Sequence, residues 1–207
     1  MYEGERFNSI THLVGAVAAM IGIAILVALA ARQGEQWQVL SFSVYGASLI
    51  ALYSISVLYH SFRGKLKAFF RKLDHYAIYT LIAGTYTPYT LITLRGAWGW
   101  TLFGVIWALA VIGIILEALP KRIDSPRILS LVIYLAMGWL CIIAIVPLLE
   151  KLPRNGFILL LLGGILYSAG VVFYIYDKKI RHFHGIWHLF VLGGSVSQFF
   201  SILLYVK

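Results

Sequence analysis

Charge is scarce in this 207-residue chain. Asp, Glu, Lys and Arg make up only 12% of it, whereas 61% of its residues are hydrophobic. Soluble domains carry about 25% charged residues, so this composition excludes an ordinary soluble protein. The few charges lie between long apolar runs, as expected where a charge at the bilayer centre costs roughly 2.5 kcal/mol or more. We therefore expect an integral membrane protein.

Cysteine and acidic residues are also rare. The single cysteine, Cys141, excludes an intramolecular disulfide and a thiolate metal cluster, and is expected to be a small core residue. The excess of basic residues gives a pI near 9.7. These residues flank apolar spans, which indicates membrane topology and contact with anionic lipid headgroups rather than nucleic acid. No linker, repeat or low-complexity stretch divides the chain, so we expect one domain over residues 1–207.

Seven apolar runs approach the length of about 20 residues that crosses a bilayer as a helix. The first is longer than the apolar core of a signal peptide and is expected to be retained. The sequence therefore predicts an all-α bundle of seven transmembrane helices. The runs are His12–Ala31, Trp37–Ser61, Asp74–Leu94, Trp98–Leu119, Ile128–Leu149, Phe157–Tyr176 and Phe183–Tyr205.

The distribution of lysine and arginine predicts the orientation of this bundle. Twelve of the 17 basic residues fall on the side of the N-terminus and five on the other. By the positive-inside rule, the N-terminus is cytoplasmic and the C-terminus lies outside. The first set is Arg6, Arg63, Lys65, Lys67, Arg71, Lys72, Lys121, Arg122, Arg127, Lys178, Lys179 and Arg181; the second is Arg32, Arg95, Lys151, Arg154 and Lys207.

The seven runs differ in polarity. The third is rich in hydroxyl side chains and contains Pro88, so we expect it inside the bundle, where neighbours satisfy its polar groups. The fourth to sixth runs are dominated by Leu, Ile and Val and are expected to face lipid. The segment Asp124-Ser125-Pro126 is typical of a helix start.

In this topology, all six histidines lie at the cytoplasmic side, at His12, His60, His75, His182, His184 and His188. His184 and His188 are four residues apart, which places both imidazoles on one helix face, close enough to bind one metal ion. Ser56 and His60 share the same spacing, and Asp74 opens the third run, where a helix N-terminus favours a carboxylate. Three histidines with one open position are typical of a catalytic zinc site.

Other polar residues have simpler interpretations. We expect His75 and His182 to be interface residues. Glu5, Asn8 and His12 are compatible with a plain helix cap, or with a place around the metal ligands. Three acidic residues lie at span ends and are expected to be solvated, namely Glu117, Glu150 and Asp177.

Three short patterns give the chain a resemblance to a known family. With them, the whole chain resembles the bacterial hemolysin III proteins, in the superfamily of the progestin and adiponectin receptors, and more distantly the alkaline ceramidases. The patterns are Glu5-x-x-Asn8-x-x-x-His12, Ser56-x-x-x-His60 followed by Asp74, and His184-x-x-x-His188.

The resemblance implies seven transmembrane helices with the N-terminus inside. It implies zinc on His60, His184 and His188, with Asp74 and Ser56 as the catalytic pair close to a bound water. The residues of the first pattern are expected around these ligands rather than among them.

We accordingly expect a multi-pass protein of the bacterial inner membrane that hydrolyses the amide or ester bond of an acyl lipid with zinc. Its partners would then be membrane lipids, one of them the substrate. Two other interpretations stay open: a non-enzymatic receptor or regulator of membrane state with structural zinc, and a cytolysin. Three histidines suit zinc, although copper and nickel also bind imidazole.

Overall fold

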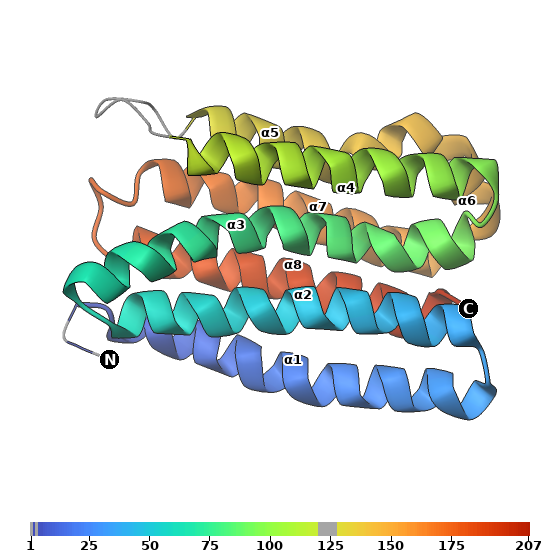
Figure 1. Cartoon of the computed structure of the whole chain (residues 1–207), viewed down its shortest axis with the longest axis horizontal. Helices are drawn as coiled ribbons and strands as arrows, with labels where there is room; N and C mark the ends of the chain where they lie inside the picture. The colour runs from blue at the N-terminus through green and yellow to red at the C-terminus, as the bar shows by residue number, and fades with distance from the viewer. Residues whose placement is uncertain (1, 3, 120–127) are drawn as a thin grey trace.

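The computed structural model describes residues 2, 4–119 and 128–207, and within these ranges its regular structure is all helical (Figure 1). The segment at 124–126, for which a helix start is predicted, lies outside the described residues. The helices are α1 (Arg6–Gln33), α2 (Gln36–Ser61), α3 (Gly64–Pro88), the π-helical turn η1 (Tyr89–Thr93), α4 (Ala97–Ala118), α5 (Ile128–Gly138), the 3₁₀ turn η2 (Leu140–Ala144), α6 (Ile145–Lys151), α7 (Arg154–Ile175) and α8 (Phe183–Tyr205).

Six helical stretches of the described chain are long and apolar enough to cross a membrane, with α5 to α6 counting as one. The multi-pass membrane protein expected from composition is therefore confirmed at this level. The helix α3 is of similar length but more polar, and it is not among the six. It lies alongside them, and the chain termini are at opposite ends of the bundle (Figure 1). The seventh crossing and the direction of insertion stay predictions.

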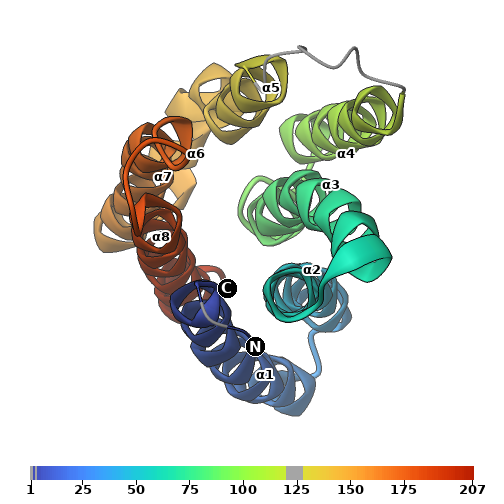
Figure 2. The same cartoon turned by 90° about the vertical axis from the view of Figure 1, so that its left-hand side faces the viewer.

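The helices form a ring when viewed along the bundle (Figure 2). Consecutive helices pack against each other from α1 to α4, and α7 packs along α8. The last helix, α8, also packs against α1, which brings the two ends of the sequence into contact. This closure places the first and third sequence patterns side by side.

The third run lies inside the bundle, as its polarity predicts. Every residue from Asp74 to Leu94 is buried or half-buried. Its hydroxyls bond to the helix backbone, for example Thr85 to the carbonyl oxygen of Leu81 at 2.8 Å. After Pro88 the chain continues as a π-helical turn, consistent with the N–H that proline lacks.

One detail of this run is predicted wrongly. The helix α3 begins at Gly64, not near Asp74, because the ten amphipathic residues before the apolar run are also helical. Asp74 is therefore in the helix interior, nearly three turns from the start. A helix N-terminus does not stabilise its carboxylate.

The fourth to sixth runs are the least buried, as predicted. In the most apolar window of α5 to α6, and in that of α7, only 11% of residues are buried, against 50% in α2. Large apolar side chains such as Ile143 and Val146 are more than 60% exposed. These surfaces match a lipid environment.

The fifth run is not one helix, which corrects the uninterrupted span expected at Ile128–Leu149. It divides into α5, η2 and α6. Pro147 lies in the first turn of α6, where its missing N–H leaves no hydrogen bond unmade. The hydroxyl of Tyr86 lies at the break, 2.9 Å from the carbonyl oxygen of Met137 and 2.8 Å from the backbone nitrogen of Cys141.

Candidate metal centre

Three histidines from α2 and α8 meet at one end of the bundle. His60 lies in the last turn of α2, and His184 and His188 lie in the first turns of α8. One potential ligand atom from each lies within 4.8 Å of the other two. Their ring centroids are 4.7 to 5.0 Å apart. The structure thus brings together the three residues predicted as metal ligands.

Each of these rings has an acceptor at its Nδ1 atom. A carboxylate or carbonyl oxygen can only accept a hydrogen bond, so each Nδ1 carries the proton and each Nε2 presents a lone pair. Metal-binding histidines are commonly held in this way by a second group on the other nitrogen. The Nδ1 contacts are His60 to Glu5 Oε2 at 2.7 Å, His184 to Asp177 Oδ2 at 2.7 Å, and His188 to the Asn8 carbonyl oxygen at 3.2 Å.

The three Nε2 atoms are buried and have no hydrogen-bond partner among the described residues. Buried polar atoms without partners are uncommon and costly. A cation bound between the three lone pairs would satisfy all of them. Three neutral imidazoles suit zinc, whose structural and catalytic sites use such nitrogen ligands.

Glu5 links the first pattern to this centre. Its carboxylate accepts hydrogen bonds from His60, from Lys67 Nζ at 2.5 Å and from the Asn8 side chain at 2.8 Å. Burial alone would raise the pKa of Glu5. The hydrogen bonds from the three donors outweigh this effect and hold the pKa well below its usual range. Glu5 occupies the N-cap position of α1 without a side-chain capping bond. The plain helix-cap interpretation is therefore wrong for Glu5.

His12 and Thr11 of α1 both contact His188. The ring of His12 stacks on that of His188, with centroids 3.6 Å apart and an angle of 18° between the planes. Thr11 Oγ1 lies 3.2 Å from His188 Nδ1. The first pattern therefore surrounds the three histidines, with His12 outside the metal-compatible group.

Asp74 and Ser56 lie beside the histidines and beside each other. Both are buried, at 7% and 1% exposure. The carboxylate of Asp74 is within electrostatic range of His60 and His184, and near the Ser56 side chain. The hydroxyl oxygen of Ser56 has no hydrogen-bond partner among the described residues. An acidic group and a hydroxyl group thus lie close to the three histidines.

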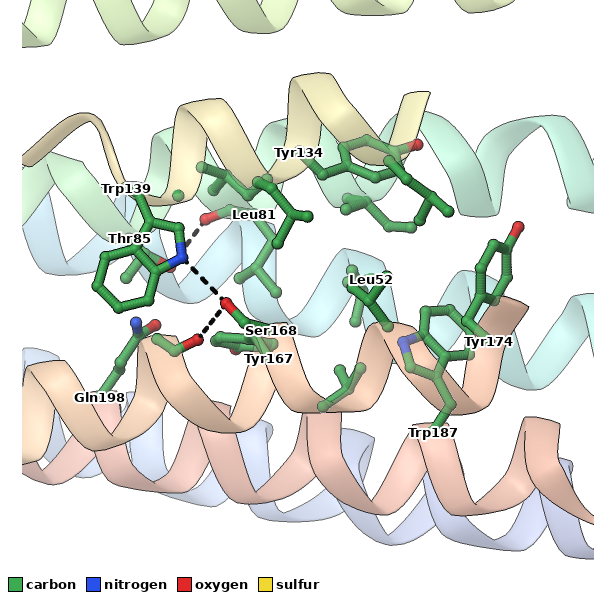
Figure 3. A pocket seen from close by; sticks show the side chains of 18 of the residues that line it. Leu52, Leu81, Thr85, Tyr134, Trp139, Tyr167, Ser168, Tyr174, Trp187 and Gln198 are labelled. Carbon is green, nitrogen blue, oxygen red and sulfur yellow. Dashed lines mark hydrogen bonds between the residues drawn. The ribbon is translucent and has the colours of Figure 1, made fainter. Parts of the chain in front are cut away.

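Two cavities meet at Asp74. A polar pocket of about 550 Å³ contains Glu5, His60 and His184 in its wall. An apolar cavity of about 140 Å³ runs between α3, α5, α7 and α8 (Figure 3). Asp74, Tyr174 and Trp187 line both.

The far part of the apolar cavity reaches Gln198 of α8 (Figure 3). Ser195 lies on the same helix face and is buried, so this polar stripe points into the bundle. Tyr53 and Tyr167 contact the Ser195 hydroxyl at 2.8 and 2.7 Å. The site therefore has a polar opening at the bundle end and an apolar extension between the helices.

Comparison with known proteins places the chain in a family. The model of a family described as "Haemolysin-III related" matches residues 1–199. The chain belongs to the haemolysin-III-related family. It is 50% identical to "Hemolysin-3" of Bacillus cereus over 98% of this chain and 91% of the relative. It is 47% identical to "Hemolysin-3 homolog" of Bacillus subtilis (strain 168), over 97% and 93%. The "Monocyte to macrophage differentiation factor" of Homo sapiens is 28% identical, over 96% and 83%.

Several polar partners in this haemolysin-III-related protein were not predicted. Asp177, expected in solvent, has a side chain only 9% exposed and bonds to His184. Glu117, also expected in solvent, is 7% exposed and lies 2.8 Å from His75 Nδ1. His75 is therefore paired rather than a free interface residue. Only Glu150 is exposed as expected.

The sequence carried a weak signal for some of these partners. Asp177 is seven residues from His184, with a turn between them, so spacing alone does not indicate contact. Lys67 is four residues from both Arg63 and Arg71 and resembles the rest of that charged segment. Thr11 precedes His12 in the first pattern and was the most accessible to prediction.

Proposed function

We propose that this chain is a zinc-dependent hydrolase that cleaves the amide or ester bond of an acyl lipid. It would act at the cytoplasmic leaflet of the bacterial inner membrane. The observation that carries the proposal is the cluster of three unsatisfied Nε2 atoms, together with the nearby carboxylate of Asp74, which lines both the polar pocket and the apolar cavity.

The donor set supports zinc as the bound ion. His60, His184 and His188 would hold the ion through three neutral nitrogens, and catalytic zinc sites commonly have three protein ligands. The chemistry that zinc supplies in such sites is to polarise a carbonyl group and to lower the pKa of a water molecule to about 7.

Asp74 and Ser56 supply the proton-handling groups of the proposed reaction. Asp74 accepts the proton of the attacking water, whose oxygen forms the new bond to the acyl carbon. The bond from that carbon to the leaving nitrogen or oxygen breaks, and Asp74 returns the proton to the leaving group. The Ser56 hydroxyl is free to donate a hydrogen bond to the Asp74 carboxylate or to the substrate.

The two cavities support an acyl lipid as the substrate class. An acyl chain would occupy the apolar cavity, and a polar headgroup would lie in the pocket with Glu5 and His184 in its wall. The bond between chain and headgroup would then pass Asp74. This is the arrangement that an amide or ester of a fatty acid requires.

The test uses the purified full-length protein loaded with zinc and a panel of N-acyl and O-acyl lipids. We expect turnover of at least one lipid. Asp74→Asn should keep the zinc content and lower turnover by roughly 100-fold or more, because it removes the general base. His184→Ala should lose both zinc and turnover.

A matched control is Glu150→Gln, which changes an exposed acidic residue away from the cluster. It should behave as the wild type in both measurements. The enzyme proposal is wrong if the zinc-loaded protein turns over none of the lipids. It is also wrong if Asp74→Asn is as active as the wild type.

A second candidate is a non-enzymatic receptor or regulator in which zinc fixes the helix arrangement. This candidate is favoured because a bound ion would join three helices. The histidines lie on α2 and α8, and their partners Glu5 and Asn8 lie at the start of α1. It predicts that His188→Ala lowers the midpoint of thermal unfolding, while Asp74→Asn leaves the biological response intact.

The name of the Bacillus cereus relative raises cytolysis as a third candidate. The measurement is leakage of a dye from liposomes that contain the purified protein. Leakage that rises in proportion to the amount of purified protein in the liposomes would support a lytic function. If the liposomes stay intact and only overexpressing cells lyse, the lysis is an indirect effect of membrane disturbance.

A further inference from the structure

A second, smaller cavity lies beyond the apolar cavity that borders Asp74. It has a volume of about 40 Å³, and Tyr89 and Leu148 are among the residues that line it. Four residues line both cavities and therefore mark the boundary between them. These boundary residues are Thr85 and Tyr86 of α3, Gly138 of α5 and Gln198 of α8.

Three of the four boundary residues cannot open this boundary readily. The Tyr86 hydroxyl bonds to the backbone of α5 at 2.9 Å, and the Thr85 hydroxyl bonds to the backbone of its own helix at 2.8 Å. Gly138 has no side chain to remove. Gln198 differs from them, because no hydrogen bond joins its amide to another described residue. Truncation of Gln198 would therefore enlarge the passage between the cavities without breaking a hydrogen bond.

The side chain of Gln198 points from α8 into the apolar cavity (Figure 3). Its amide end lies toward Thr85 and Trp139, which line the same cavity. Its stem lies against the backbone of α7, where a Cβ atom added at Gly163 would be 2.5 Å from the Gln198 Cγ atom. The room left by Gly163 thus lets Gln198 extend across the far end of the cavity.

The distance from Asp74 to this boundary corresponds to a definite length of acyl chain. Thr85 follows Asp74 by eleven residues in α3, and this separation is a rise of about 16 Å along the helix. An extended carbon chain advances about 1.3 Å per bond, from a C–C bond of about 1.5 Å. A chain with its carbonyl carbon near Asp74 would therefore reach the boundary after about 12 carbons.

We propose that Gln198 closes the far end of the acyl-chain cavity and thereby limits the lipid to acyl chains of about 12 carbons. A longer chain has to displace the Gln198 side chain and bury its amide against methylene groups, which offer no hydrogen bond. The inference rests on the proposed function for the identity of the guest as an acyl lipid. It concerns the fit of the chain and does not depend on cleavage of the lipid.

The experiment measures the binding of octanoic, lauric, palmitic and stearic acid to the full-length protein in lipid nanodiscs. Affinities are corrected for partitioning into protein-free nanodiscs, and zinc content is measured on each variant. Gln198→Ala removes the amide and most of the stem, whereas Gln198→Met keeps an unbranched side chain of similar length. Val196→Ala is the matched control, because it shortens a side chain on the same helix that is 44% exposed.

We expect the wild type to bind lauric acid more tightly than palmitic or stearic acid. Gln198→Ala should strengthen palmitic acid binding by about 10-fold or more, because additional methylene groups become buried. Its affinity for lauric acid should stay within about 2-fold of the wild type, because that chain ends before the boundary. Gln198→Met and Val196→Ala should keep the chain-length preference of the wild type, and all variants should keep their zinc.

A second truncation keeps the inference testable if Gln198→Ala does not fold. Gln198→Asn is shorter by one methylene group and retains the amide, so it should shift the preference in the same direction by a smaller amount. An unchanged preference in both truncations would overturn the inference. So would an equal shift in Gln198→Met, which keeps the bulk of the side chain, or an absence of fatty acid binding by the wild type.

The outcomes separate this inference from the proposed function. If no lipid is cleaved but truncation of Gln198 moves the binding preference to longer fatty acids, the hydrolase proposal fails and the inference stands. If lipids are cleaved and truncation leaves the chain-length preference unchanged, the hydrolase proposal stands and the inference fails.

Discussion

At the scale of single residues, the centre depends on groups that hold the histidines. Asp177 illustrates this, because its carboxylate fixes the Nδ1 proton of His184 and directs Nε2 toward the other two rings. Without that acceptor, His184 can rotate or change tautomer, and the lone pair is lost from the site.

Asp177→Ala should therefore lower zinc affinity by roughly 10- to 100-fold. Asp177→Asn should lower it less, because the amide oxygen still accepts a hydrogen bond from Nδ1. The measurement is competition for zinc with a chelator of known affinity, on purified protein. Glu150→Ala, on an exposed acidic residue, is the control. Equal affinities for Asp177→Ala and the wild type would show that the contact does not orient His184.

How far the sequence predicts the site can be followed through these same residues. Helical spacing and topology place all six histidines at one depth, and the resemblance to a known family selects His60, His184 and His188 among them. Asp177 was not predictable, because the turn between α7 and α8 brings it back to His184 and no periodicity describes a turn. Interface carboxylates and ligand-orienting carboxylates have the same sequence signature.

At the scale of helices, Tyr86 stabilises the break in the fifth run. Its hydroxyl lies 2.9 and 3.0 Å from the carbonyl oxygens of Met137 and Gly138, and accepts a bond from Cys141 N–H at 2.8 Å. In a bilayer no water replaces these bonds. One side chain of α3 therefore satisfies backbone groups that the α5-to-η2 transition leaves open.

Tyr86→Phe should destabilise the protein by about 1–3 kcal/mol, because backbone groups at the break lose their partner. The measurement is the midpoint of thermal unfolding in detergent. The control is Tyr176→Phe, which removes the hydroxyl of a side chain that is 45% exposed and should change stability by less than about 0.5 kcal/mol. Equal midpoints for the two variants would contradict this role of Tyr86.

The same region shows why helix boundaries were harder to predict than helices. Ile128–Leu149 is apolar throughout, so hydropathy cannot reveal an interruption. The decisive group, Tyr86, is on another helix. At α3 the error had a different cause: its first ten residues are amphipathic and helical but outside the apolar run, so the run began late at Asp74.

At the scale of the whole molecule, the ring of helices gives the site its parts. Packing of α8 on α1 closes the ring and places His12 against His188, 176 positions apart in the sequence (Figure 2). The interior position of α3 then brings Asp74 beside the same cluster. A site assembled from α1, α2, α3 and α8 therefore requires the complete bundle.

The side of the membrane on which the C-terminus lies, relative to the N-terminus, decides whether the number of crossings is odd or even. If α3 crosses together with the six apolar stretches, the crossings are odd in number and the two termini face opposite sides. The structure favours this, since the termini lie at opposite ends of the bundle (Figure 1). Arg63 and the basic residues in the first turns of α3 predict that this end of the bundle, with the N-terminus and the histidine cluster, lies in the cytoplasm.

Alkaline phosphatase, which is active only outside the cytoplasm, should therefore be active when fused after Lys207. Green fluorescent protein at the same position should be dark when exported by the general secretion route. Fusions placed in the loop after Arg63 should give the opposite pair of signals. An inactive phosphatase and a fluorescent protein at Lys207 would mean an even number of crossings. In that case α3 would not span the membrane, and the proposed site, which needs Asp74 at the same membrane depth as the histidines, would be contradicted.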